Sequence, residues 1–275
     1  MVEINDKIAQ RQYSMKKPAN NSNMKKIGWG TFALFASVFT LTLIVTAPAS
    51  LLAKMVESRS NGQFVLANAA GSLWQGSATP AIRQRAGSLL VLEKLHWDLA
   101  LLPLFGGKMV TSFRWDNVVQ AQPMQATLSF SQIELRNALV PLPAVIIGEL
   151  MPMLQPAQLS GQLQIRSEQL TFSKSGINGN AQAEWLNAGS VLSTVNPLGS
   201  YNINLTGAGE RLDMTLLTTS GMLLLEGSGN FTREQGLKFQ ITARAAEDSK
   251  GRLDELLNNL GPESAPGVHS LSLMR

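Results

Sequence analysis

The ionisable residues of this chain offer little that could do chemistry. Its 275 residues include two histidines, no cysteine and only 15% charged side chains. His96 alternates with the apolar Leu95 and Trp97, so we expect it on the polar face of a strand. His269 follows a segment containing Gly and Pro. Neither histidine has a serine, histidine or carboxylate at a spacing typical of catalysis, so both are interpreted as solvated surface residues.

The other patterns associated with catalysis are also missing from the sequence. Gly207-Ala208-Gly209 is followed by Glu210, without the third glycine and the strand–helix context of a nucleotide-binding loop. The acidic residues occur singly, with no pair resembling a glycosidase or two-metal site. Without cysteine there is no thiolate metal site and no thiol nucleophile. We therefore predict no catalytic, cofactor-binding or metal-binding residue, and the sequence does not favour an enzyme.

Charge separates a short N-terminal segment from the rest of the chain. Residues 1–26 hold six basic and two acidic side chains, a net charge of +4 that equals the net charge of the whole chain. Residues 27–275 are therefore neutral. Because phosphate binding requires clustered Lys or Arg, nucleic acid is not an expected partner.

The run that follows the basic segment predicts a membrane anchor. Residues 27–53 contain no charged side chain. A helix over Ile27–Ala47 would be about 31 Å long, which matches a bilayer core of roughly 30 Å. Basic residues beside such a helix stay in the cytoplasm. We therefore expect a cytoplasmic tail over residues 1–26, a single-pass membrane anchor over 27–52, and a domain outside the cytoplasm over 53–275.

A cleaved signal peptide is the alternative interpretation of the same run. The apolar part of a signal peptide spans about 7–15 residues and ends in a small-residue cleavage motif. This run is longer, but Ala47-Pro48-Ala49 and Leu51-Leu52-Ala53 resemble weak cleavage motifs. A buried core helix is a third alternative, although no other part of the chain is apolar enough to enclose one.

The exported part has the period-two pattern of strands. Apolar residues alternate with polar ones over several segments, which is typical of an antiparallel sheet packed on one side. Turn signals containing Gly or Pro separate these segments. We predict a twisted, curved antiparallel β-meander. The alternating apolar residues are Leu95, Trp97 and Leu99; Ala126, Leu128 and Phe130; Leu163 and Ile165; Tyr201, Ile203 and Leu205; Leu212, Met214 and Leu216; and Phe239, Ile241 and Ala243.

Two segments depart from alternation and predict short helices that cap the sheet. Prolines bracket Ala144–Met151, where an apolar helix is expected on the sheet or at its end. Leucines recur at helical spacing over Leu253–Leu260, and Gly261 with Pro262 supplies a stop.

Several motifs, taken in order, make the chain similar to type II secretion system protein N. Gly71 to Ala78 is followed by Leu95 to Leu99, then by Asn196 to Tyr201, Thr218 to Gly227 and Leu253 to Gly261. The resemblance implies a non-enzymatic accessory component of the Gram-negative secretion machinery, anchored in the inner membrane with its main domain in the periplasm. Such a component supports export of folded proteins from the periplasm across the outer membrane. The partners it implies are other subunits of the apparatus and inner-membrane lipid. The matching residues, interpreted as structural, are Gly71, Trp74, Gly76, Trp97, Pro197, Gly199, Tyr201, Gly221 and Gly227.

A second similarity concerns architecture alone. The predicted sheet resembles the AsmA-like periplasmic proteins, whose curved sheets form grooves that hold lipid. An apolar face that includes Leu163, Ile203 and Phe239 could line such a groove, which gives an acyl-lipid binding or transfer module as the alternative function. An ordinary closed core accounts for the same residues.

Overall fold

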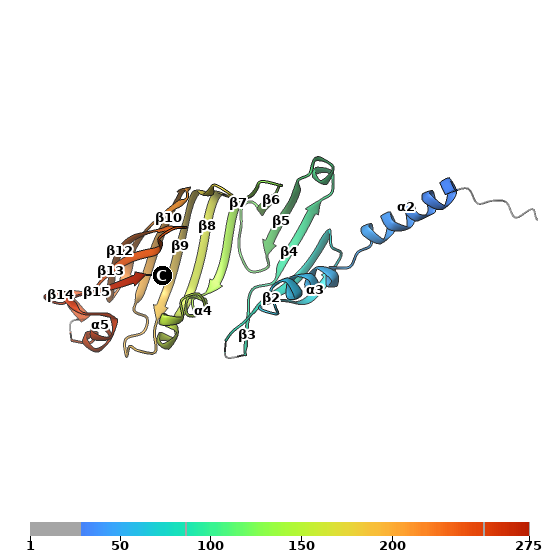
Figure 1. Cartoon of the computed structure of the whole chain (residues 1–275). Helices are drawn as coiled ribbons and strands as arrows, with labels where there is room; N and C mark the ends of the chain where they lie inside the picture. The colour runs from blue at the N-terminus through green and yellow to red at the C-terminus, as the bar shows by residue number, and fades with distance from the viewer. Residues whose placement is uncertain (1–28, 86, 250, 275) are drawn as a thin grey trace, which may run out of the picture. The chain divides into compact units, whose positions relative to one another are not determined.

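The computed structural model of the chain describes residues 29–85, 87–249 and 251–274, and it divides into units over Met1–Val45 and Thr46–Arg275 (Figure 1). In the first unit, helix α2 (Trp29–Val45) has exposed side chains from Gly30 onward. No helix within the described ranges combines the length and hydropathy needed to cross a membrane. The predicted basic tail, together with Ile27 and Gly28, lies outside the described residues.

The helix predicted over residues 27–52 is interrupted. α2 ends at Val45, and a second helix, α3 (Ala49–Arg59), begins after Pro48. Proline lacks the N–H that a helix interior requires, and its ring disfavours helical backbone in the residue before it. Ala49 is 1% exposed because it packs on the sheet of the second unit, against Ala78 and Trp97. Residues 49–52 therefore belong to the sheet unit.

The second unit is built on one antiparallel sheet of 15 strands. Strands that are adjacent in the chain pair throughout most of the sheet, as predicted for a meander. There are two exceptions: β3 pairs only with β2, and β15 lies between β13 and β14. The strands are β1 (Phe64–Gly71), β2 (Gln75–Arg83), β3 (Leu89–Val91), β4 (Leu95–Ala100), β5 (Met109–Trp115), β6 (Met124–Leu128), β7 (Gln132–Pro143), β8 (Ser160–Ser173), β9 (Gly176–Gly189), β10 (Gly199–Gly209), β11 (Arg211–Gly221), β12 (Leu223–Thr232), β13 (Gly236–Ala245), β14 (Glu263–Ala265) and β15 (Val268–Met274).

The strand register places the alternating residues on two distinct faces. Ile165 lies opposite Ala183, which lies opposite Ile203, and Ile203 in turn lies opposite Leu216. Since side chains alternate along a strand, the residues between these, such as Gln164, lie on the other side of the sheet. We call the two sides the apolar face and the polar face. The predicted alternation is thereby confirmed from β8 to β11.

Short helices cover parts of the apolar face. α3 packs on the N-terminal end of the sheet. α4 (Ile146–Leu150) packs over β8 and β9, and α5 (Asp254–Leu260) packs over β12 and β13. Figure 1 shows β7 to β10 side by side with α4 at one end of these strands. Both predicted capping helices are present. The first is shorter than expected, because β7 continues to Pro143. The 3₁₀ turns are η1 (Leu102–Gly106), η2 (Pro152–Ala157) and η3 (Glu247–Ser249).

The sheet curves toward its apolar face. Ile82 of β2 and Leu90 of β3 pack against a buried cluster that contains Ile146 and Leu163. In sheet order, β4, β5 and β6 separate β2 from β7. Side chains of β2 and β3 therefore share a cluster with α4 and β8, although β4 to β7 lie between β2 and β8 in sheet order.

Candidate binding surfaces

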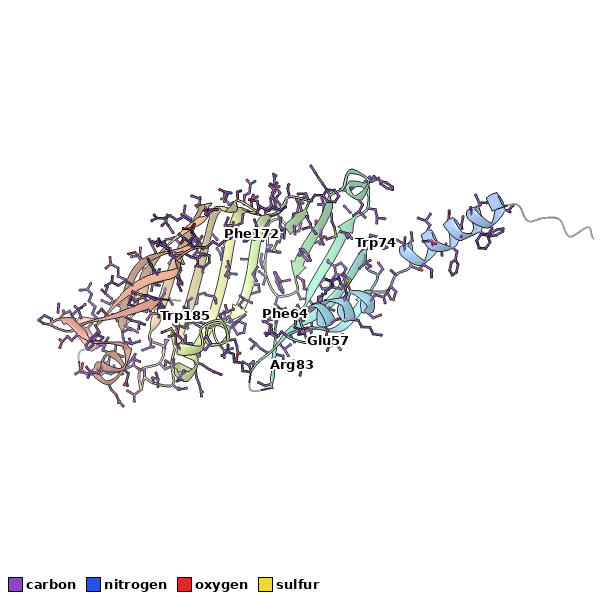
Figure 2. All side chains as sticks on the ribbon, in the orientation of Figure 1. Glu57, Phe64, Trp74, Arg83, Phe172 and Trp185 are labelled. Atoms are coloured by element: carbon purple, nitrogen blue, oxygen red, sulfur yellow. The ribbon has the colours of Figure 1, made fainter. Side chains whose placement is uncertain are left out.

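The first group of family-motif residues lies where β1, β2 and β4 meet. Trp97 is 6% exposed, and its indole N–H donates to the carbonyl of Leu73 at 3.1 Å. A Cβ added to Gly76 would lie 2.6 Å from Cζ2 of Trp97. Gly71 has φ +89°, and a Cβ there would lie 2.6 Å from the carbonyl oxygen of Gln75. Trp74, in the turn between β1 and β2, is half-buried (Figure 2).

The second group lies near α5, where β10, β11 and β12 meet. Tyr201 is 2% exposed, and its hydroxyl donates to the carbonyl of Leu223 at 3.0 Å. Burial raises the pKa of the Tyr201 phenol. Gly199 pairs with Gly221, and a Cβ added to Gly221 would lie 2.2 Å from the Cα of Gly199. Gly227 is tight as well, because a Cβ there would lie 2.9 Å from the carbonyl of Gln240. These contacts are consistent with the structural role predicted for the motif residues.

Two further members of the region lie beside this second group. Pro197 follows a cis peptide bond with Asn196 and is exposed. Trp185 of β9, labelled in Figure 2, comes from the neighbouring strand. Its ring is tilted against that of Tyr201, with 5.7 Å between ring centroids, and its N–H donates to the carbonyl of Ser160 at 3.0 Å. The family motifs thus form two groups in separate parts of the sheet, one on β1, β2 and β4 and the other around β10, β11 and β12, and they do not converge on one site.

The two histidines have different environments. His96 lies on the polar face, as predicted, and its Nε2 is 2.5 Å from Oδ1 of Asp116, a partner that the sequence analysis missed. The prediction for His269 was wrong, because its side chain is buried on the apolar face opposite Ala243. Its Nδ1 lies 2.9 Å from the carbonyl of Gly261, so this nitrogen carries the proton. The segment that contains His269 forms the β14–β15 hairpin, and the alternation along β15 turns His269 inward.

The ionisable side chains that the structure describes form no recognisable metal-binding group. Within the ranges that the structure describes, no three His, Asp or Glu side chains gather into a group that could hold a metal ion. The ion pairs are surface pairs: the side chains of Arg136 and Arg211, for example, are 58% and 60% exposed. Such pairs contribute at most about 1 kcal/mol each to stability. Binding through apolar or neutral polar surface is therefore the chemistry that these faces offer.

An exposed apolar surface occupies the hairpin ends of β4 to β7. Leu102 and Phe105 of η1 are 83% and 92% exposed, and Phe130, in the turn after β6, is 95% exposed. The Phe130 ring lies against η1, because a Cβ on Gly107 would be 2.7 Å from its Cε2. We call these three exposed side chains the apolar tip. Phe130 was predicted to lie inside a strand, but it lies in the turn after β6. The apolar run from Leu101 to Phe105, which precedes Gly106, is the feature of the sequence that could have indicated this surface.

The fold and these surfaces define a class of protein: an open antiparallel sheet with apolar covering helices and surfaces suited to binding. The sequence model of the family described as "Type II secretion system (T2SS), protein N" matches residues 63–272, which run from the start of β1 into β15. The chain belongs to this family, and the resemblance seen in its motifs is confirmed. Family membership makes it a component of the type II secretion system.

A curated relative supports the same conclusion. The chain is 24% identical over 253 residues to a Pectobacterium carotovorum subsp. carotovorum protein called "Type II secretion system protein N". The similarity covers 90% of this chain and 96% of the relative. No solved structure matches the chain.

Proposed function

We propose that the protein is a non-enzymatic accessory subunit of the type II secretion system, held in the inner membrane. In this role it supports export of folded proteins from the periplasm across the outer membrane. The observation that carries the proposal is the apolar tip, on a chain that belongs to the protein N family. Contiguous apolar surface that stays exposed in a folded domain marks a site of interaction with protein or membrane.

The apolar tip has the composition of a protein contact. Phe105 and Phe130 come from different turns of the sheet and are 92% and 95% exposed, and the Phe130 ring lies beside Gly107, two residues after Phe105. Aromatic residues are enriched at interface centres because they bury large areas at little conformational cost. We assign the apolar tip to contact with another subunit of the secretion apparatus.

The membrane placement rests on the N-terminal segment. Phe32, Phe35 and Phe39 of α2 are 72%, 70% and 65% exposed, which is costly in water and favourable in hydrocarbon. In the sequence the uncharged run begins earlier, at Ile27, directly after the basic residues 1–26. The positive-inside rule then gives a cytoplasmic N-terminus and a periplasmic sheet.

Co-purification from native membranes tests the subunit role. The intact protein should retain other subunits of the apparatus, and the double variant Phe105→Ser with Phe130→Ser should lose them and reduce exoprotein secretion. Met153→Ser is the matched control, because Met153 is 57% exposed on η2, away from the apolar tip. Retention of every subunit by the double variant would refute the assignment of the tip.

Reporter fusions test the placement. A fusion after residue 60 should be active only in the periplasm, and the mature protein should keep residues 1–26. A mature N-terminus near residue 50 or 54 would instead show that the N-terminal run is a cleaved signal peptide.

A lipid-binding module is the second candidate. It is favoured by the apolar face between α4 and α5, where Ile203, Leu205 and Ile241 are half-buried. Native mass spectrometry of the protein released from detergent distinguishes the candidates. A bound acyl lipid supports the groove, whereas its absence, together with no uptake of dye-labelled lipid, leaves these residues as an ordinary core.

A further inference from the structure

The polar face carries a pocket that neither the secretion role nor the lipid alternative uses. Its volume is about 1810 Å³, and its floor is formed by β7, β8, β9 and β10. With strands about 4.8 Å apart, four strands span roughly 14 Å. Residues 117–122, between β5 and β6, together with Val91 and Glu93, form a second side of the same pocket.

The segment over residues 116–123 is held in place by hydrogen bonds. The side-chain amide of Asn117 donates to Glu93 at 2.8 Å, and that of Asn137 donates to Gln122 at 3.0 Å. The backbone N–H of Asp116 donates to the carbonyl of Lys94 at 3.0 Å. The pocket therefore has a formed wall on this side before any ligand binds.

Carboxamides dominate the floor of the pocket. Gln162 and Gln164 come from β8, Asn180 and Gln182 from β9, and Asn204 from β10. Register sets these rows side by side, since Gln182 lies opposite both Arg166 and Asn204. In the described part of the chain, the side-chain amides of Gln162, Asn180, Gln182 and Asn204 have no hydrogen bond to protein. Each offers two N–H donors and an acceptor oxygen to a ligand.

Gln120 adds a second observation at the same place. It lines the pocket, and both its amide nitrogen and its amide oxygen are buried without a hydrogen-bond partner among the described residues. A buried, unpaired amide costs about 1–3 kcal/mol.

The lining also exposes aliphatic side chains. Val119 is 101% exposed, Val91 is 61% exposed and Leu186 is 40% exposed, and each belongs to a different part of the pocket. A ligand that fits this surface presents hydrogen-bonding groups together with C–H surface. Sugar rings have this combination, with hydroxyl and acetamido groups at their edges and C–H groups on their faces.

Charge rules out the common ionic ligands. The charged residues of the lining are Glu93, Arg166 and Glu168, a net charge of −1. Arg166 is itself engaged by Gln164 at 2.6 Å and lies 4.0 Å from Glu184. Phosphates, nucleic acids and anionic headgroups require clustered cations, which this surface lacks.

We infer that the polar pocket binds a neutral oligosaccharide bearing N-acetyl groups. The acetamido N–H and carbonyl pair with the free amides of Gln182 and Asn204 and with the amide N–H of Gln164, whose oxygen accepts from Arg166. The ring faces pack on Val119 and Leu186. The inference concerns the polar face alone, so it stands whether or not the apolar tip contacts a secretion subunit.

Titration of the full-length protein in detergent with a β-linked N-acetylglucosamine tetramer tests the inference. Calorimetry should show saturable binding, with at least tenfold weaker affinity for the double variant Gln164→Leu with Gln182→Leu. Gln240→Leu is the matched control, because Gln240 is exposed on the polar face of β13, outside the pocket, and its affinity should be unchanged. The corresponding glucose tetramer, which lacks acetamido groups, should bind at least tenfold more weakly.

Several results would overturn the inference. The first is that the unaltered protein shows no saturable binding. The second is that the double variant keeps its thermal melt and binds the N-acetylglucosamine tetramer as tightly as the unaltered protein does. The third is that the unaltered protein binds the glucose tetramer as tightly as the N-acetylglucosamine tetramer. Saturable binding of an uncharged unfolded peptide, with no response to the sugar, would assign the pocket to polypeptide instead.

Discussion

The indole ring of Trp97 on β4 lies against the backbone of Gly76 on β2, in the position that a side chain at residue 76 would occupy. The two residues pair in register, and the Trp97 N–H reaches past Gly76 to the carbonyl of Leu73. Two family-motif residues, separated by twenty-one positions in sequence, thus form one packing unit, together with the α3 residue Ala49.

Gly76→Val should therefore destabilise the sheet unit. A Cβ there would lie 2.6 Å from the Trp97 ring and 2.8 Å from the carbonyl of Ala70, so the ring or the backbone must move. We expect a loss of roughly 1–3 kcal/mol in the free energy of unfolding, measured by denaturant titration. Gly106→Ala is the control, because a Cβ at Gly106 meets nothing within 4 Å. An unchanged Gly76→Val protein would show that the Trp97 contact does not constrain the fold.

Tyr201→Phe should destabilise the protein by leaving the buried carbonyl of Leu223 without its donor. The expected loss is about 1–3 kcal/mol, the usual cost of an unsatisfied buried acceptor. Thr215→Val, at an exposed position of the neighbouring strand, should change stability by less than about 0.5 kcal/mol. Similar urea midpoints for the two variants would contradict the importance of the Tyr201 hydrogen bond.

The same tyrosine predicts a pH dependence. Burial raises the pKa of Tyr201 above the ordinary value of 10.0. Folding favours the protonated phenol. Its contribution to the free energy of unfolding is therefore fully present below pH 10, and it is lost as the pH rises above that value toward the folded-state pKa. The stability difference between the unaltered protein and Tyr201→Phe should shrink in melts recorded above pH 10. A constant difference across that range would contradict the predicted linkage.

The two histidines should differ in their effect on stability. His269→Ala removes a buried ring and the donor to the carbonyl of Gly261, and should cost at least about 1 kcal/mol. His96→Ala removes one partner of the exposed contact between His96 and Asp116 and should cost less than about 1 kcal/mol. Parallel thermal melts compare them directly. A folded His96→Ala protein that has lost secretion activity would reopen the search for chemistry at His96 and Asp116.

Leucine truncations should distinguish the covering helices from the apolar tip. Leu257 of α5 is 3% exposed, so Leu257→Ala should cost about 2–5 kcal/mol through lost burial and the cavity left behind. Leu102 is 83% exposed, so Leu102→Ala should change the free energy of unfolding by less than about 0.5 kcal/mol. A large loss in Leu102→Ala would show that the tip is a structural element.

Much of the sheet could be predicted from the sequence because side-chain direction along a strand is local. The alternation of Tyr201, Ile203 and Leu205 with Asn202 and Asn204 predicted which side chains share a face, and the register confirms it. Leucine spacing and the Gly-Pro stop similarly predicted α5. These features depend on neighbours within a few residues.

The helix break, the inward position of His269 and the polar pocket required the tertiary structure. Ala49 belongs to α3 and not to a continuous anchor helix, because it packs on Ala78 and Trp97. His269 turns inward because its segment pairs with β13. The apolar tip exists because Phe130 meets η1, and the pocket exists because residues 117–122 face β7 to β10. Composition and periodicity determined the class of fold and its two faces, since these depend on local geometry. Contacts between distant segments decided the surfaces, because nothing local specifies which strands and loops meet.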